Sequence, residues 1–244
     1  MKTIPLKLPK VIGHRGLAKF APENTIDSIR KAHEHHLSWV EVDVMLSRDN
    51  IPVLLHDETL DRTTNAKGLL TDHDLQHLLS VDEGSWFHPD FKNASIPTLH
   101  EALTVCDKLN LSINLELKPS HHNEERLLLE TLDCIHKLEL HCPHILFSSF
   151  NKSLLKLCAT TASNFPLAYL VDDKDNEASI IQFAKEISCY SVHLPIELVS
   201  PALIQQLHTL GKKVLVFTVN EQLQAEQLIA QGVDAVFSDY PLVL

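Results

Sequence analysis

Glycine is scarce in this sequence. It occurs 6 times among 244 residues, roughly a third of its usual proportion. These six positions form neither a GxGxxG turn nor a Walker loop, the glycine-rich loops that let a backbone close around nucleotide phosphates. The sequence therefore excludes both kinds of nucleotide site. Gly211 and Gly232 each follow a predicted helix and precede a predicted strand, where a left-handed residue commonly ends a helix.

Positive charge is also in deficit. Lys and Arg number 21 against 32 Asp and Glu, a formal net charge of -11 with neutral histidine. Nucleic acids and anionic membranes are bound through basic patches, so we expect neither nucleic-acid binding nor stable membrane association. No apolar run approaches the ~18 residues of a membrane span, and Pro5 and Pro9 interrupt the first ten residues before a signal-peptide core could form. We expect a cytoplasmic protein.

The cysteines lack the pattern of a disulfide framework or a zinc site. They are odd in number, well separated and never spaced as CxxC. We therefore expect reduced, buried thiols at Cys106, Cys134, Cys142, Cys158 and Cys189.

Short apolar or β-branched runs alternate with helical stretches, the pattern of repeated βα units. Eight strands are predicted, at residues 11–14, 39–46, 112–117, 144–149, 167–171, 189–194, 213–219 and 233–238. Helices are predicted at residues 23–35, with Asn24 as a candidate cap, 123–138, 178–186, 201–209 and 221–230. A ninth run, residues 51–56, follows a turn too short for a parallel crossover, so it should form an antiparallel hairpin arm.

Eight βα units in a chain of this length predict an α/β protein with a TIM (β/α)8 barrel. We expect one catalytic domain over residues 1–244, with the hairpin arm after the second strand and a small insertion, about residues 57–96, over the C-terminal face. The alternative is an open doubly wound sheet. A dinucleotide-binding member of that class would need the glycine-rich first turn that is missing here.

Three acidic residues lie on predicted strands in apolar surroundings. Glu41 and Asp43 are two residues apart, so both side chains project from one face while the intervening valines face the helices. Glu116 has the same setting on a later strand. Acids directed into a barrel are costly without a cation. A half-exposed strand face is the alternative, but three acids at C-terminal strand ends favour a site, and oxygen-only ligands suit Mg²⁺, Ca²⁺ or Mn²⁺.

Two histidines and two cationic residues stand near the same strand ends. His14 ends the first strand beside Arg15, and His56 ends the hairpin arm. Each histidine could be a core residue, but a pair near a metal could act as general base and general acid. Arg15 and Lys118 would hold an anion, unless they are solvated surface charges. Together with a hard cation, these groups describe a site for phosphoryl chemistry.

Two phenylalanines allow two interpretations. Phe150 and Phe217 lie at or near strand ends. They are either core residues or a wall for the carbon skeleton of a substrate.

The chain resembles the glycerophosphodiester phosphodiesterases, of the cytosolic bacterial type, in an ordered series of short motifs. They are HRG at 14–16, PENT at 22–25, EVDV at 41–44, HDETLDRTT at 56–64, GSWF at 84–87, IPTL at 96–99, ELK at 116–118 and SDYP at 238–241. A single motif such as HRG would be weak evidence, but the series spans nearly the whole chain.

This resemblance implies a metal-dependent TIM-barrel enzyme. It would hydrolyse glycerophosphodiesters, such as glycerophosphocholine or glycerophosphoethanolamine, to sn-glycerol 3-phosphate and an alcohol. The cofactor would be one divalent cation, Mg²⁺ or Ca²⁺, with Mn²⁺ as a further option. The implied roles are metal ligands at Glu41, Asp43 and Glu116, an acid/base pair at His14 and His56, and phosphate binding at Arg15 and Lys118.

Two positions depart from the family pattern: Phe217 stands where tryptophan is common, and Ser238 where threonine is common. Both bear on substrate fit rather than on the chemistry. Two alternatives remain at this point. A lysophospholipase D or phospholipase C-like enzyme should show an apolar approach surface or an anchor, and a non-catalytic phosphodiester-binding protein should have lost a histidine or a ligand. We expect a monomer or a homodimer.

Overall fold

The computed structural model describes residues 6–140 and 144–244, so Pro5 and Cys142 lie outside the described residues. Within these ranges eight parallel strands follow one another around a closed ring, because β1 pairs with both β2 and β9. The predicted TIM barrel is confirmed. The strands are β1 (Val11–Gly13), β2 (Trp39–Leu46), β4 (Ser112–Leu117), β5 (Ile145–Ser149), β6 (Leu167–Leu170), β7 (Ser191–Pro195), β8 (Lys213–Phe217) and β9 (Ala235–Ser238).

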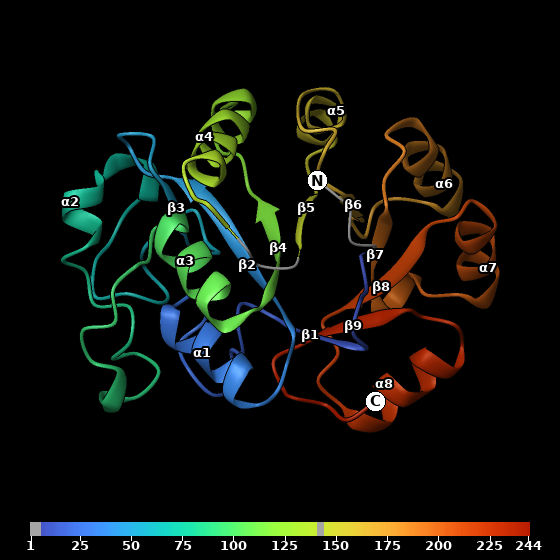
Figure 1. Cartoon of the computed structure of the whole chain (residues 1–244), viewed down its shortest axis with the longest axis horizontal. Helices are drawn as coiled ribbons and strands as arrows, with labels where there is room; N and C mark the ends of the chain where they lie inside the picture. The colour runs from blue at the N-terminus through green and yellow to red at the C-terminus, as the bar shows by residue number, and fades with distance from the viewer. Residues whose placement is uncertain (1–5, 141–143) are drawn as a thin grey trace.

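Helices surround the strands (Figure 1). In the described part of the chain they are α1 (Ile26–Glu34), α3 (Leu99–Leu109), α4 (Glu124–His136), α5 (Lys152–Thr161), α6 (Glu177–Glu186), α7 (Pro201–Thr209) and α8 (Gln222–Ala230). The predicted helices are present with small shifts at their ends, while α3 and α5 are not among those predicted. Gly211 and Gly232 have φ values of 70° and 106°, which confirms their left-handed conformation after α7 and α8.

The start of α1 corrects one prediction. Thr25, not Asn24, caps the helix, because the Thr25 hydroxyl accepts a hydrogen bond from the Ser28 amide at 3.2 Å. Asn24 precedes the cap with φ 58°. Its amide group instead forms two hydrogen bonds with Asp43, one to the side chain and one from the backbone. The Asn24 side chain, which the local sequence predicts as the helix cap, therefore bonds to β2 instead.

The hairpin arm is β3 (Pro52–Leu54), which pairs antiparallel with β2 as predicted. Its partners on β2 run from Val44 to Leu46, so the arm leaves the barrel at the carboxyl end of the strands. The segment that follows includes the short helix α2 (Leu75–Leu78) and the 3₁₀ turns η1 (Leu70–Asp72) and η2 (Pro89–Phe91). It has its own apolar cluster, formed by Met45, Val53, Leu55, Leu60, Leu70, Leu78, Val81 and Ile96, and lies at the left of Figure 1 beside β3.

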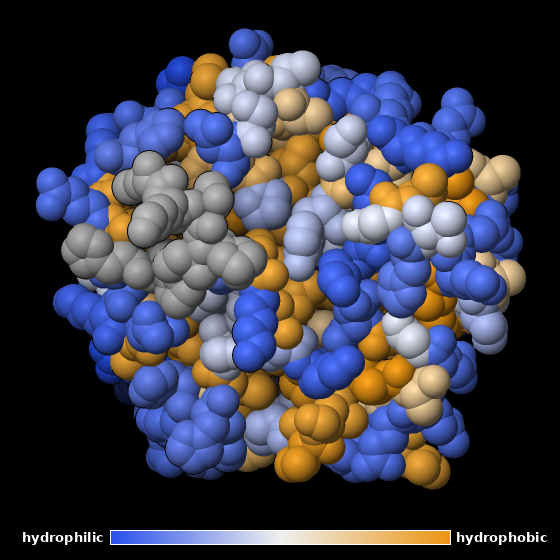
Figure 2. All heavy atoms as spheres, turned by 45° about the vertical axis from the view of Figure 1, so that its right-hand side comes forward, coloured by the Kyte–Doolittle hydropathy of each residue, from blue (hydrophilic) through white to orange (hydrophobic). Residues whose placement is uncertain are grey.

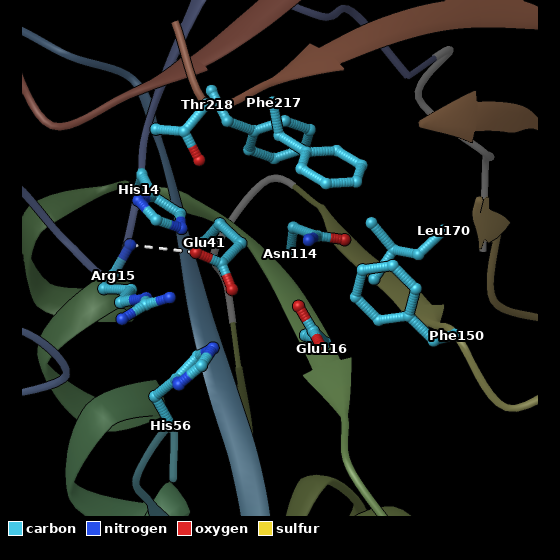
Figure 3. A pocket seen from close by; sticks show the side chains of 11 residues that line it. His14, Arg15, Glu41, His56, Asn114, Glu116, Phe150, Leu170, Phe217 and Thr218 are labelled. Carbon is cyan, nitrogen blue, oxygen red and sulfur yellow. Dashed lines mark hydrogen bonds between the residues drawn. The ribbon is translucent and has the colours of Figure 1, made fainter. Parts of the chain in front are cut away.

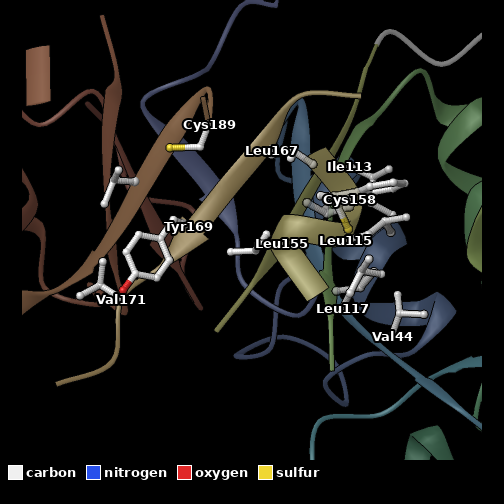
Figure 4. Close-up of a cluster of buried hydrophobic side chains, with 14 of the residues drawn as sticks. Val44, Ile113, Leu115, Leu117, Leu155, Cys158, Leu167, Tyr169, Val171 and Cys189 are labelled. Atoms are coloured by element: carbon white, nitrogen blue, oxygen red, sulfur yellow. The ribbon is translucent and has the colours of Figure 1, made fainter. Parts of the chain in front are cut away.

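The main core is the apolar layer between the barrel and its helices (Figure 4). Val42 and Val44 of β2 lie in this layer with Leu115 of β4 and Leu155 of α5, as the alternation on β2 predicts. Each fully buried side chain of this size contributes roughly 1.5–3 kcal/mol. The layer also holds Cys106, Cys158 and Cys189.

Inside the barrel, apolar side chains gather around Trp39, Leu146, Leu215 and Ala235. The first residues that the structure describes add to this cluster, since Leu6 and Leu8 pack against it. Glu41, Asp43 and Glu116 lie further along their strands than the apolar side chains that begin them.

The described cysteines mostly match the expectation of buried thiols. Burial raises the pKa of Cys158 to about 12 and that of Cys189 to about 11. Cys134 is only partly buried. Among residues 6–140 and 144–244, none of the helices combines the length and the hydrophobicity that a membrane span requires. Hydrophilic residues cover much of the face in Figure 2.

Candidate active site

A cavity lies at the carboxyl ends of the barrel strands (Figure 3). One side carries polar residues that lie on or follow β1, β2, β3 and β4, and the other carries Thr218 and apolar residues that lie on or follow β5, β6, β8 and β9. The lining residues are His14, Arg15, Glu41, His56, Asn114, Glu116, Phe150, Leu170, Phe217, Thr218 and Phe237. Asp43 and Lys118 also reach this site, because Lys118 Nζ lies 3.3 Å from Asp43 Oδ1 and 3.7 Å from Glu116 Oε1.

Glu41, Asp43 and Glu116 form one compact cluster. One carboxylate oxygen from each lies within 4.8 Å of the others. The parallel register explains the proximity, since Asp43 of β2 lies opposite Glu116 of β4. Glu41 Oε1 is buried without a hydrogen-bond partner among the described residues. An unsatisfied anionic oxygen beside two further carboxylates suits a hard divalent cation.

The charges of this cluster depend on its surroundings. Burial, followed by repulsion from Asp43, raises the pKa of Glu41 well above its usual value and that of Glu116 to about 7. Burial alone would also raise the pKa of Asp43, but the positive charges of Lys118 and Arg15 outweigh it and lower that pKa. Two of the three acids are therefore not stable as anions side by side, and a dication would relieve this repulsion.

Arg15 connects the acid cluster to the loop before α1. Its amide donates to Glu41 Oε2 at 2.8 Å, and its Nη1 donates to Glu23 Oε1 at 2.7 Å. Its Nε is buried without a hydrogen-bond partner in the described structure. Burial alone would lower the pKa of Arg15, but Asp43 and Glu23 raise it, so the guanidinium stays charged. Arg15 Nε lies 3.6 Å from Asp43 Oδ2, an ion pair without a hydrogen bond, so this N–H can still donate to an anionic oxygen.

Each predicted catalytic histidine is paired with a carboxylate. His14 Nδ1 lies 2.7 Å from Asp239 Oδ1, and Asn220 donates to the other Asp239 oxygen at 2.7 Å. His56 Nδ1 lies 2.7 Å from Asp57 Oδ1. A carboxylate at Nδ1 fixes the ring orientation and leaves Nε2 for proton transfer.

The pKa of His56 is lowered, chiefly by burial and then by the nearby charges of Lys118 and Arg15, which together outweigh the attraction of Asp43. Its imidazole is therefore held neutral near pH 7.

Arg62 links the two polar arms of the site. Its guanidinium donates to both oxygens of Asp57, at 2.7 and 3.0 Å, and to both oxygens of Glu23, each at 2.8 Å. Glu23 in turn accepts from Arg15. The sequence alone predicts no role for Arg62, Asp57 or Asp239, although all three lie within the motifs HDETLDRTT and SDYP.

Phe150 and Phe217 form part of the apolar side of the cavity. Their ring centroids lie 5.9 Å apart with the rings nearly perpendicular. Phe150 is 43% exposed, so it is a wall of the cavity mouth rather than a core residue. Leu170 and Phe237 extend this wall.

A closed barrel that gathers acids, imidazoles and guanidinium groups at its carboxyl end defines a TIM-barrel enzyme site. The family model described as "Glycerophosphoryl diester phosphodiesterase family" matches residues 14–243. The chain therefore belongs to the glycerophosphoryl diester phosphodiesterase family, and it is an enzyme of that family. The resemblance seen in the sequence motifs is confirmed.

Individual relatives agree with this result. A glycerophosphodiester phosphodiesterase of Caldanaerobacter subterraneus is 30% identical over 240 residues, which cover 96% of this chain and 95% of the relative. One from Bacillus subtilis is 28% identical over 243 residues, covering 94% of this chain and 83% of the relative. A phosphodiesterase of Oleispira antarctica, solved in complex with the product sn-glycerol-3-phosphate, superposes with a TM-score of 0.92 at 36% identity, covering 96% of this chain and 94% of that chain.

Proposed function

We propose that this chain hydrolyses glycerophosphodiesters, such as glycerophosphocholine or glycerophosphoethanolamine, to sn-glycerol 3-phosphate and an alcohol. The observation that carries the proposal is the convergence of three acids, two carboxylate-paired imidazoles and Arg15 on one cavity. The product bound to the Oleispira antarctica relative supports the substrate class. We place the reaction in the cytoplasm, in one catalytic domain that acts as a monomer or a homodimer.

Glu41, Asp43 and Glu116 would hold one divalent cation, Mg²⁺ or Ca²⁺, with Mn²⁺ as a further option. The donor set fits because all three groups offer carboxylate oxygens and Glu41 Oε1 has no other partner in the described structure. When bound, such a cation lowers the pKa of a hydroxyl and neutralises phosphate charge.

Arg15 and Lys118 would bind the phosphate. The buried Arg15 Nε is a donor without a hydrogen-bond partner, and Lys118 Nζ lies between Asp43 and Glu116. A phosphate oxygen beside them would accept charge-assisted hydrogen bonds. Phe150 and Phe217 would contact the carbon skeleton of the substrate, since their rings line the same cavity.

His14 and His56 would transfer the protons. One imidazole removes the proton from the glycerol 2-hydroxyl as this oxygen attacks phosphorus, and the other protonates the departing alcohol. Water then opens the cyclic phosphate while the histidines exchange roles. Internal attack gains from proximity, for which well-oriented cases supply ~7–11 kcal/mol. Direct attack by water is the alternative route, and only that route would cleave a substrate that lacks the 2-hydroxyl.

The decisive experiment measures release of sn-glycerol 3-phosphate from glycerophosphocholine. His14→Ala and His56→Ala should each lower kcat by ~10² to 10⁴, because each removes a general acid or base, while the substrate still binds. His33→Ala is the matched control, since His33 is exposed on α1, and its rate should equal that of the wild type. Unchanged cleavage in both site variants would refute the assigned roles.

A further inference from the structure

Asn114 is a buried amide in the floor of the cavity. It lies on β4 two residues before Glu116, so both side chains face the barrel interior. One end of the amide donates to Ser148 Oγ at 3.0 Å. The other end, Oδ1, has no hydrogen-bond partner among the described residues, although Asn114 is only 1% exposed.

A buried polar atom without a partner costs roughly 1–3 kcal/mol, and such atoms are rare in native structures. Glu41 Oε1 is another of them, and Glu41 lies opposite Asn114 in the β2–β4 register. Glu41 has an evident partner in the proposed cation, because it belongs to the acid cluster. Figure 3 shows the Asn114 oxygen pointing toward Leu170 and Phe150, away from Arg15 and Glu41. A substrate atom is therefore the natural partner of this end of the amide.

A hydroxyl group fits this place better than a charged group. Leu170, Phe150 and Phe237 make the adjacent wall apolar, which suits the carbon chain of a small polyol. A hydroxyl both donates and accepts hydrogen bonds. It would therefore pair with the free end of the amide whichever way the amide is turned, because the Ser148 hydroxyl also does both.

The depth of Asn114 indicates which part of the substrate it meets. Phe150 is 43% exposed at the cavity mouth, whereas Asn114 is almost fully buried. In a glycerophosphodiester the glycerol is constant and the alcohol varies, so the closed end of the cavity suits the glycerol and the open mouth suits the alcohol.

We propose that Asn114, held by Ser148, binds a hydroxyl of the glycerol end and thereby selects glycerol phosphate esters over other phosphates. This inference rests on the proposed function, since it assumes that the phosphate lies beside Arg15. Asn114 is a specificity-determining residue in this view.

Calorimetric titration of the metal-loaded protein with sn-glycerol 3-phosphate and with inorganic phosphate tests the proposal. In Asn114→Leu, which keeps a similar volume without a hydrogen-bonding group, affinity for sn-glycerol 3-phosphate should fall about 10-fold or more. Affinity for inorganic phosphate should stay unchanged. Ser148→Ala is the matched variant: it leaves the amide in place but removes its tether, so it should give a smaller loss for the same ligand.

The wild type supplies a test that does not depend on the folding of a variant. Analogues of sn-glycerol 3-phosphate that lack the 1-hydroxyl or the 2-hydroxyl should include at least one that binds more weakly to the wild type. If both bind as tightly as the parent compound, or if Asn114→Leu keeps the parent affinity or loses both ligands equally, the proposal is overturned. A wild type that binds sn-glycerol 3-phosphate but cleaves no glycerophosphodiester would instead contradict the proposed function, and selective loss in Asn114→Leu would still support recognition by Asn114.

Discussion

Glu83 shows how one buried acid affects the molecule. It is 0% exposed in the insertion, and neither carboxyl oxygen has a hydrogen-bond partner in the described structure. Burial, and then repulsion from Glu23, raises its pKa well above the usual value. Glu83 is therefore held in its neutral form, because an unpaired carboxylate would be costly there.

We predict that Glu83→Gln becomes more stable relative to the wild type as the pH rises. The folded state binds the Glu83 proton more tightly than the unfolded chain does, so the stabilisation from that proton is complete below the unfolded pKa of 4.5 and is lost as the pH rises through the folded pKa. Between these two pKa values, the free energy of unfolding of Glu83→Gln minus that of the wild type should grow by about 1.4 kcal/mol per pH unit. Urea unfolding from pH 4 to 8 measures it. Glu58→Gln, at an exposed position of the same insertion, should show no such slope. If the free energies of unfolding of Glu83→Gln and the wild type changed in parallel with pH, the prediction would be wrong.

The placement of the polar site residues was largely predictable from single positions. Glu41, Asp43 and Glu116 stand out because acids alternate with apolar residues on strands. The carboxylates that orient the histidines were not predictable in the same way. Asp239 lies 225 residues from His14 along the chain, and only the closed barrel brings them together. Asn24 was misassigned as a cap for a similar reason, since its partner Asp43 lies on another element.

At the scale of elements, Arg62 holds the hairpin arm against the loop before α1. Asp57 follows His56 at the end of the arm, and Glu23 lies in the loop that also carries Arg15. Four hydrogen bonds from one guanidinium span the two. The planar guanidinium of arginine can form such a bridge, whereas the ammonium group of lysine cannot form bidentate hydrogen bonds to two carboxylates at once.

We predict that Arg62→Gln lowers kcat about 10- to 100-fold by loosening the position of His56. Loss of the positive charge should also strengthen the pull of Asp57 on His56, so the pKa of His56 should rise and the limb of the kcat/KM profile that reports His56 should move to higher pH. Steady-state rates between pH 5 and 9 measure both effects. Arg48→Gln, on the exposed turn of the same arm, is the control, and an Arg62 variant that behaves like it would show that the bridge has no part in positioning.

Element types were predicted more reliably than element ends. The bounds of β2, β4 and α7 coincide with the predicted ranges, because local patterns there agree with the packing. β7 was predicted over residues 189–194 but occupies Ser191–Pro195, since its pairing with β6 and β8 sets its ends. The helix α3 was missed although Thr98 and Glu101 form a capping box at its start, a signal that the sequence does contain.

For the molecule as a whole, the acid cluster links metal binding to the stability of the barrel. Glu41 comes from β2 and Glu116 from β4, so their mutual repulsion acts between two neighbouring strands of the barrel. A ligand that binds only the folded state stabilises it by RT ln(1 + [L]/Kd), about 2.7 kcal/mol at 100 times Kd.

We predict that Mg²⁺ or Ca²⁺ raises the Tm of the wild type and that a chelator reverses this shift. Glu41→Gln should abolish most of the shift, because it removes a ligand, and should raise the Tm of the metal-free protein at pH 8, because it removes a buried acid whose pKa is raised. Thermal denaturation with and without chelator measures both. Glu125→Gln, at an exposed position of α4, should behave like the wild type. If Glu41→Gln kept the full rise in Tm on metal addition, Glu41 would be excluded as a ligand.

The pairing of β1 with β9 has a consequence for the newly made protein. Translation produces Asp239 225 residues after His14. The ring has no closing partner for β1 until β9 has left the ribosome. A nascent chain thus carries all three acids long before one of its imidazoles is oriented. Competence for hydrolysis should therefore arise in a single late event rather than grow gradually during synthesis.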